Sequence, residues 1–257
     1  MRGNVAFRPI VAQRLYQQVA EQIAALIRDG AFAPGARLPP ERDLAQQFGV
    51  SRPTVREAMI ALEIAGLIDI RSGSGVYVAS GSGVYVALPD AAAAKTLPAL
   101  GDAGPSLFDI LAARRTVECE IAALAAAQPD PDALAALERL IAAQDAAMKR
   151  GQADGRVGGH AEDRAFHLAI AAMAGNEVLT GFAAALWDTM FTPVYARLAE
   201  RTEGPRKTRS TIADHRAILA ALARADAAGA RRAMRAHIAH TEALFLGDPK
   251  PPEKAAP

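Results

Sequence analysis

A carboxylate and several imidazoles are spaced along the second half of the chain in a pattern that could bind a metal. All five histidines lie in that half. In EDRAFHLAI, Asp163 precedes His167 by four residues, so the two share one helix face. His215 lies in DHRAILAAL, and His237 and His240 lie in RRAMRAHIAH. One acid and several imidazoles that converge inside a helical bundle would bind a divalent transition metal.

The same residues allow a simpler interpretation, because histidines at the surface or in a core account for five occurrences without any metal. A helical metallohydrolase is the competing functional class. Against it, the sequence contains no HExxH, no glycine-rich phosphate loop and no nucleophile with a placed base. Glu162 is the only acid close enough in sequence to act beside the metal, and its helical phase turns it away from Asp163. We therefore expect a protein that is not an enzyme.

A second group of residues, in SRPTVRE, is typical of a helix that enters the major groove of DNA. Ser51 is a good N-cap, so Arg52, Thr54 and Arg56 fall in the first turn of a helix or just beyond it. Such a helix presents its first turn to bases and phosphates. Arg52 and Arg56 are four residues apart and share a face. Their planar guanidinium groups suit guanine edges and phosphate oxygens.

Two further arginines precede this helix and are placed to hold the DNA backbone: Arg42 near the start of the preceding helix, and Arg37 before it. From Arg37 to Arg71, however, five arginines are balanced by five acids, so a merely solvated pair of helices is the alternative. A strand, a glycine turn and a second strand follow. Because a winged module needs such a hairpin beside its recognition helix, this order favours DNA binding.

The elements that must position these residues follow from periodicity and capping. Residues 11–29 carry apolar side chains at a helical spacing, and Gly30 ends this helix. The loop AFAPGARLPP leads to a short helix, ERDLAQQF (41–48), and Gly49 permits a tight turn. The helix RPTVREAMIALEIA (52–65) comes next, and LIDIR (67–71) is expected to be a strand.

The eight residues SGSGVYVA occur twice in tandem, at 72–79 and 80–87. Each copy is a Gly/Ser turn followed by a β-branched and aromatic run, which is typical of half a hairpin. A shift of eight keeps strand alternation in phase, so either copy could pair with LIDIR. The first copy closes the shorter loop and is favoured by roughly 1 kcal/mol of closure entropy. We expect the first copy to be the wing; the second adds a third strand, lengthens the tether, or is a neutral duplication.

The rest of the chain is expected to be helical. Residues 89–105 show no amphipathic period and are interpreted as a linker. From 106 to 248 the periodicity predicts an all-α antiparallel bundle of six or seven helices, and 249–257 a disordered tail. The expected fold is therefore mainly α, with an N-terminal winged helix-turn-helix (α+β) in residues 1–88, which include the duplicated wing unit 72–87.

Composition narrows the class of protein. The 257 residues are 51% hydrophobic, enough for two domains, and the net charge of +1 predicts neither nucleic acid nor membrane binding by bulk charge. The single cysteine, Cys119, excludes an internal disulfide and suggests a reducing compartment. No signal core is present, and no stretch approaches the ~20 apolar residues of a membrane span. We expect a cytoplasmic protein without a membrane partner.

The first part of the chain resembles the GntR family of bacterial regulators. The resemblance covers roughly Leu15 to Val78, and LPPERDLAQQFGVSRPTVREA is its specific signature. It implies that Arg42, Arg52 and Arg56 contact double-stranded operator DNA. It also implies that the wing turn, around Gly73 and Gly75, approaches the minor groove. Pro40 stands where many relatives have serine, with little expected effect because the position precedes the helix.

The helical part, roughly Leu107 to Leu246, is similar to the FCD effector domain of the FadR-like branch of that family. The resemblance implies a bound zinc, nickel or manganese whose open positions receive a carboxylate effector. The implied metal ligands are Asp163, His167, His215 and His237. It also implies that Arg114 pairs with the effector carboxylate, against the alternative of a surface arginine. Asn176 matches a family asparagine that is either structural or effector-binding.

Together the two resemblances imply a homodimeric transcriptional regulator, most often a repressor. A small organic acid bound in the helical domain would change its affinity for a near-palindromic operator. FHLAIAAMAGNEVL and Trp187 are most similar to members that sense sugar acids such as uronates or gluconate. The alternatives are a metal-sensing regulator without an organic effector and the metallohydrolase.

Overall fold

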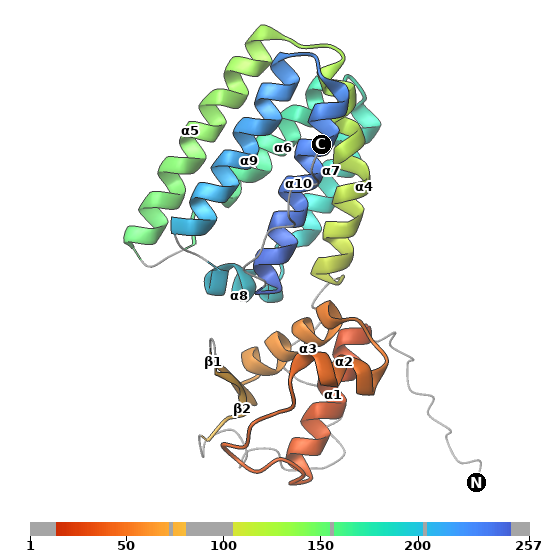
Figure 1. The fold of residues 1–257 in the computed structure, drawn as a ribbon, viewed down its shortest axis with the longest axis vertical. Coiled ribbons are helices and arrows are strands. Elements are labelled where there is room, and N and C mark those ends of the chain that lie inside the picture. The colour runs from red at the N-terminus through yellow and green to blue at the C-terminus, as the bar shows by residue number, and fades with distance from the viewer. Residues whose placement is uncertain (1–13, 72–73, 81–104, 155–156, 203–204, 248–257) are drawn as a thin grey trace, which may run out of the picture. The chain divides into compact units, whose positions relative to one another are not determined.

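The computed structural model describes residues 14–71, 74–80, 105–154, 157–202 and 205–247. The chain divides into two compact units, Met1–Gly101 and Asp102–Pro257 (Figure 1). In the described residues the first unit holds three helices and a two-stranded sheet, and the second holds seven helices. The mainly α fold class is confirmed. Among these residues no helix is long and apolar enough to cross a bilayer.

In the first unit, α1 (Leu15–Arg28) packs against α3 (Arg52–Ile64), and its buried side chains include Val19, Ile23 and Ile27. The expected apolar stripe begins one residue later than the periodicity suggested, because Tyr16 is buried and Leu15 is exposed. Between them, α2 (Glu41–Phe48) ends at Gly49. The φ angle of Gly49 is 66°, in the left-handed region that glycine tolerates, which turns the chain sharply toward α3.

The wing is built from the first SGSGVYVA copy. β1 (Ile68–Arg71) pairs antiparallel with β2 (Gly75–Val78) in the register Ile68 to Val78 and Ile70 to Val76. This confirms the predicted pairing. Apart from Ser80, the second copy lies outside the described residues, so the two roles proposed for it stay predictions.

The segment expected to be only a loop, residues 31–40, also contributes to the wing. Leu38 donates its amide to the carbonyl of Val76, and Val78 donates to the carbonyl of Ala36, both at 2.9 Å. These bonds cover the edge of β2 that β1 leaves open. Backbone pairing needs no alternating side-chain pattern, which is why a stretch rich in proline and glycine did not predict it.

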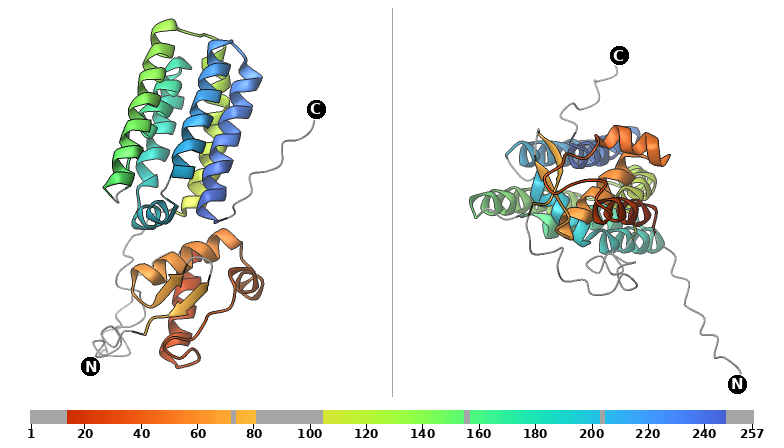
Figure 2. Two further views of the ribbon diagram at one scale, coloured as in Figure 1. Left: turned by 60° about the vertical axis from the view of Figure 1, so that its left-hand side comes forward. Right: turned by 90° about the horizontal axis from the view of Figure 1, so that it is seen from below.

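The second unit is a bundle of antiparallel helices, which Figure 2 shows side by side. The helix α10 packs against α4 and α9, α5 packs against α6 and α9, and α4 packs against α6 and α7. The short α8 lies across one end of the bundle (Figure 1) and contacts α10. The helix bounds are α4 Leu107–Ala126, α5 Pro131–Ala153, α6 His160–Met173, α7 Glu177–Met190, α8 Pro193–Thr202, α9 Pro205–Ala223 and α10 Ala227–Phe245.

Short polar side chains begin these helices. Ser106 accepts a hydrogen bond from the amide of Asp109 and caps α4, and Asp130 caps α5. Asp226, which the sequence suggested as a cap between two late helices, accepts from the amide of Gly229 at 2.7 Å and starts α10. These caps fix where each helix begins, and hence the height at which its inward-facing residues lie.

Both the expected linker, apart from Pro105, and the expected tail, residues 249–257, lie outside the described residues.

Candidate functional site

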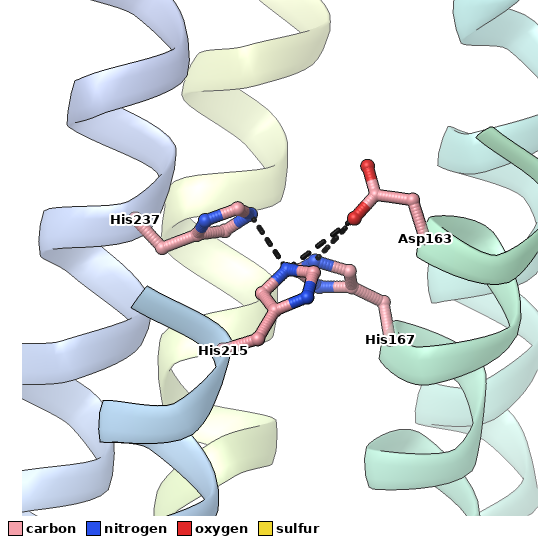
Figure 3. Close-up of side chains that lie close together, drawn as sticks. All are labelled: Asp163, His167, His215 and His237. Carbon is pink, nitrogen blue, oxygen red and sulfur yellow. Dashed lines mark hydrogen bonds and ion pairs between the residues drawn. The ribbon is translucent and has the colours of Figure 1, made fainter. Parts of the chain in front are cut away.

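The four residues expected to bind a metal meet inside the bundle (Figure 3). Asp163 and His167 come from α6, His215 from α9 and His237 from α10. One ligand atom from each lies within 4.8 Å of the others, and all three histidines are buried. The spacing of four on α6 places two of these candidate ligands on one helix face. His215 and His237 reach the same point from α9 and α10, which pack against each other and against α4.

The distances within the cluster suit a tetrahedral metal. Nε2 of His215 lies 3.3 Å from Oδ1 of Asp163 and 3.4 Å from Nε2 of His237. Nε2 of His167 is 3.9 Å from the same Asp163 oxygen and has no hydrogen-bond partner among the described residues. Bonds of 2.0–2.1 Å in a tetrahedral zinc site separate neighbouring ligand atoms by about 3.4 Å. The donor atoms thus converge where a metal ion would satisfy all of them.

A carboxylate that the sequence analysis did not single out, Glu118 on α4, supports His167. Its Oε2 lies 2.6 Å from Nδ1 of His167, so the other ring nitrogen, Nε2, faces the cluster. Its Oε1 accepts a 2.6 Å hydrogen bond from Nε of Arg114. Burial alone would raise the pKa of Glu118, but the Arg114 guanidinium and His167 outweigh it and hold the pKa well below its usual range. In the sequence, the spacing of four between Arg114 and Glu118 could have indicated this ion pair on one helix face.

Arg114 itself is buried and fully engaged. Besides Glu118, its guanidinium lies 3.9 Å from the ring centroid of Trp187, and Nη1 is 3.3 Å from Sδ of Met190. The surface alternative is therefore wrong, since the side chain is 3% exposed. In this state the arginine pairs with an internal carboxylate.

Asp214 supports His237 on the opposite side of the cluster and also pairs with His240. Oδ2 of Asp214 lies 3.6 Å from Nδ1 of His237 and 2.8 Å from Nδ1 of His240. His240 is partly exposed and lies outside the cluster, as expected. His215 is held differently, because its ring stacks on Phe166 at a centroid distance of 4.1 Å. Each histidine of the cluster thus has its own orienting contact.

Electrostatics prepare the cluster for a cation. Burial lowers the pKa of His167 and lowers that of His215 well below its ordinary value, so both are neutral at pH 7 and their lone pairs are available. Burial would raise the pKa of Asp163, but His215 and His167 outweigh it and lower the value to about 2. Gln144 on α5 donates to Oδ1 of Asp163 at 3.0 Å and orients the carboxylate.

Asn176 is not part of this cluster. Its Oδ1 accepts hydrogen bonds from the amides of Val178 and Leu179 at 3.1 Å, so it is the exposed N-cap of α7. Asp163 lies near the other end of α6, about 15 Å of helical rise before the helix ends at Met173, and Asn176 follows that end. Capping accounts for this asparagine, which is the structural of its two expected roles.

One cavity reaches the cluster, and a second, larger cavity shares two lining residues with it. The inner one, about 30 Å³, reaches Asp163 and His237 and has room for one or two water molecules. The outer one, about 580 Å³, is within the size range of small-molecule pockets. His160 and Tyr195 line both cavities. The rings of these two residues therefore stand between the metal cluster and the larger space.

The residues expected to bind DNA lie in the first unit around the start of α3. Oγ of Ser51 accepts from the amide of Thr54 at 3.2 Å, and the two hydroxyls are 2.8 Å apart, so this pair caps the helix. Arg52 is exposed on the first turn. Arg56 instead forms an ion pair with Glu41 of α2, and both side chains are mostly buried. One of the two arginines is available at the surface, while the other also joins α2 to α3.

The remaining basic residues differ in their surroundings. The side chain of Arg42 is 86% exposed beside Asp43. Arg37 lies against the wing turn, because a Cβ added to Gly75 would come within 2.8 Å of its Nε. Gly75 has a φ of 125°, a backbone conformation that favours glycine over residues with a Cβ. Gly73 lies outside the described residues.

Comparisons with known proteins agree with this geometry. Residues 15–78 match the bacterial regulatory proteins of the gntR family, and residues 109–240 match the FCD domain. The Uxu operon transcriptional regulator of Escherichia coli K12 is 34% identical over 91% of this chain and 88% of its own length. The Uxu operon regulator of Haemophilus influenzae is 32% identical over 89% and 80%. The Exu regulon transcriptional regulator of E. coli K12 is 32% identical over 92% and 86%.

Proposed function

The chain belongs to the GntR family of DNA-binding transcriptional regulators and carries an FCD domain, and from this premise we propose that it is a ligand-responsive repressor. A small carboxylate held at the Asp163, His167, His215 and His237 cluster would change its affinity for operator DNA. The observation that carries this proposal is the convergence of four ligand atoms within 4.8 Å. As a protein that acts on operator DNA, it would work in the cytoplasm.

Three imidazoles and one carboxylate would hold the metal, and this donor set favours zinc or nickel over manganese. A bound ion would supply positive charge that attracts a carboxylate. Around it, Glu118 and Asp214 keep two of the histidine rings turned with Nε2 inward, and Gln144 orients Asp163. Because Arg114 is already paired with Glu118, the ion rather than the arginine would provide the first anchor for the effector.

The effector class that we propose is a sugar acid. The inner cavity is lined by apolar residues such as Met148 and Phe245 and by polar groups. The polar groups, among them Gln144, His160, Thr211 and Thr241, could hydrogen-bond a hydroxylated molecule. Three relatives that match along most of this chain are named as regulators of the Uxu operon or the Exu regulon, which is said of those proteins. A ligand of this size must displace the His160 and Tyr195 rings, because the inner cavity holds only about 30 Å³.

Operator reading at two half-sites requires a dimer of fixed geometry. The exposed face of α7 offers a surface for a second copy of this chain. Val178 and Phe182, four residues apart on that face, are 66% and 57% exposed. Gly181 beside them has open space around its Cα, which would let a partner helix approach closely. Effector binding would then act by shifting the separation of the two DNA-binding modules.

A second candidate is a regulator in which the metal ion itself is the signal. The small inner cavity favours this reading, since it would accept an ion and a water molecule without any rearrangement. Both candidate functions use the same cluster. They differ in whether the signal is the metal ion alone or an organic acid bound to it.

Operator binding measured by fluorescence anisotropy separates them. The chain is first freed of metal, then titrated with zinc alone, D-galacturonate alone, and both together. The sugar-acid proposal expects weakened DNA binding only with both. A full response to zinc alone would support the metal-sensing candidate. A chain that prefers no promoter fragment over random DNA would contradict both.

A further inference from the structure

Polar residues continue from the metal cluster toward one end of the bundle. On α9, Thr211 and Lys207 precede His215 by four and eight residues, so all three lie on one helix face. On α6, His160 precedes Asp163 by three residues, and on α10, Thr241 follows His237 by four. These continuations meet, because the inner cavity beside the cluster is lined by His160, Lys207, Thr211 and Thr241 together with Asp163 and His237.

Two polar atoms on cavity-lining residues outside the metal cluster lack hydrogen-bond partners among the described residues. They are Oε1 of Gln144 and Nε2 of His160. Gln144 is 2% exposed and its Nε2 is already committed to Asp163, so its free oxygen remains as an acceptor within the site. Buried polar groups in native proteins are normally paired. A ligand with hydroxyl groups would complete the pairing of both atoms.

The charges of His160 and Lys207 determine which ligand groups the cavity can hydrogen-bond. Burial, together with the nearby Lys207 ammonium, lowers the pKa of His160 to about 4, so the imidazole is neutral at pH 7. It can then donate or accept a hydrogen bond, whereas the ammonium of Lys207 only donates. The end of the cavity away from the cluster therefore favours oxygen acceptors on a ligand.

From these observations we propose that Lys207, Thr211 and His160 form a second subsite that binds the distal hydroxylated end of an acid whose carboxylate lies at the metal cluster. This inference rests on the proposed function and adds which residues would select a hydroxylated acid as the effector. Along α9, eight residues separate His215 from Lys207, which corresponds to about 12 Å between their Cα atoms. A six-carbon sugar acid spans that gap once the two side chains reach inward.

The subsite would favour a hydroxylated acid over an alkyl acid, because an alkyl chain cannot hydrogen-bond its polar groups. A fatty acid of the same length would reach the metal but place an alkyl chain against the Lys207 ammonium, the Thr211 hydroxyl and the Gln144 oxygen, and it would offer none of them a hydrogen bond. Sites built to hydrogen-bond a polar ligand reject the analogue that lacks those groups more strongly than apolar pockets reject an extra methylene.

Isothermal titration calorimetry of the full-length chain loaded with zinc tests this. D-Galacturonate and hexanoate serve as polar and apolar probes. The parent is expected to bind galacturonate at least ten times more tightly than hexanoate. Lys207→Met is expected to weaken galacturonate binding tenfold or more and to leave hexanoate binding and zinc stoichiometry unchanged. Thr211→Val, which keeps the side-chain shape, is expected to weaken galacturonate binding severalfold.

Arg209→Met on the exposed face of α9 is the matched control and is expected to bind both probes like the parent. If Lys207→Met and Thr211→Val both bind galacturonate with the parent's affinity, the subsite is overturned while the proposed function stands. If Lys207→Met does not fold, Thr211→Val alone decides. A parent chain that binds zinc but neither acid would overturn the sugar-acid function, and this inference with it.

Discussion

Oε2 of Glu118 lies 2.6 Å from Nδ1 of His167, which places a buried carboxylate of α4 directly behind a metal-cluster histidine of α6. The same carboxylate accepts hydrogen bonds from Nε and Nη2 of Arg114. Two roles thus meet in one side chain: it orients a ligand toward the cluster and it neutralises a buried guanidinium. This arrangement ties the stability of the bundle to the geometry of the candidate metal site.

Glu118→Gln should therefore damage both stability and metal binding. Removing one partner of a buried ion pair leaves Arg114 uncompensated, and we expect a loss of about 3–5 kcal/mol in the free energy of unfolding of the metal-free protein. Zinc affinity should fall about 10–100-fold as the His167 ring loses its orienting contact. Urea unfolding and competition with a chelating dye measure the two. Glu120→Gln, two residues along α4 at an exposed pair with Arg231, should change neither.

Replacing two ligands should remove the metal without affecting the DNA-binding unit. His215→Ala with His237→Ala leaves Asp163 and His167, too few donors for a stable four-ligand site. Metal content by elemental analysis should drop to zero, and operator binding should no longer respond to zinc with sugar acid. DNA affinity without effector should match the parent. His240→Ala is the control, because His240 lies outside the cluster; retained stoichiometry in the double variant would remove the site.

The two arginines of the recognition helix should behave differently. Arg52→Ala removes an exposed side chain, so operator affinity should fall with no change in the unfolding midpoint. If Arg52 contacts a phosphate, the salt slope of binding should fall by about 1. Arg56→Ala also breaks the ion pair with Glu41, so it should lower both DNA affinity and the stability of the unit. Parent-like DNA binding by both variants would show that the recognition helix has been wrongly assigned.

Acid should destabilise the metal-free protein. His160, His167 and His215 have pKa values lowered from their ordinary value, so the unfolded chain binds more protons than the folded one below pH 6.5. The contribution of these histidines to the free energy of unfolding is fully present above that pH and is lost as the pH falls. For His160, whose pKa is about 4, the loss between pH 6.5 and 5 is about 1–2 kcal/mol. Thermal unfolding at stepped pH should show this slope, and His160→Asn should reduce it; an unchanged slope in His160→Asn would contradict the assignment.

Deleting residues 80–87, the second SGSGVYVA copy, should leave the wing intact. The first copy already pairs with β1 on one edge and with Ala36 and Leu38 on the other, so its register does not depend on the second. Operator affinity should change less than about threefold, a free-energy difference under about 0.7 kcal/mol. A large loss of affinity would instead assign the second copy a role in DNA binding or in spacing the two units.

Local sequence determined the parts of this protein that depend on short-range geometry. The fixed period of the α-helix puts Asp163 and His167 on one face of α6, whatever surrounds them. It likewise puts His215, Thr211 and Lys207 on one face of α9. Ser51 and Asp226 cap their helices through bonds that span three residues. The shorter loop selected the first copy of the repeat as the wing, as the register confirms.

Only the tertiary structure decided which side chains meet. Glu118, Gln144 and Asp214 reach the cluster from α4, α5 and α9, and nothing in their local spacing points to His167, Asp163 or His237. The pairing of Arg56 with Glu41 likewise spans 15 residues across a helix turn. Such contacts depend on how each helix is rotated and shifted against its neighbours. The apolar stripes that set this packing are broad and tolerate several rotations, so the helical period alone does not specify it.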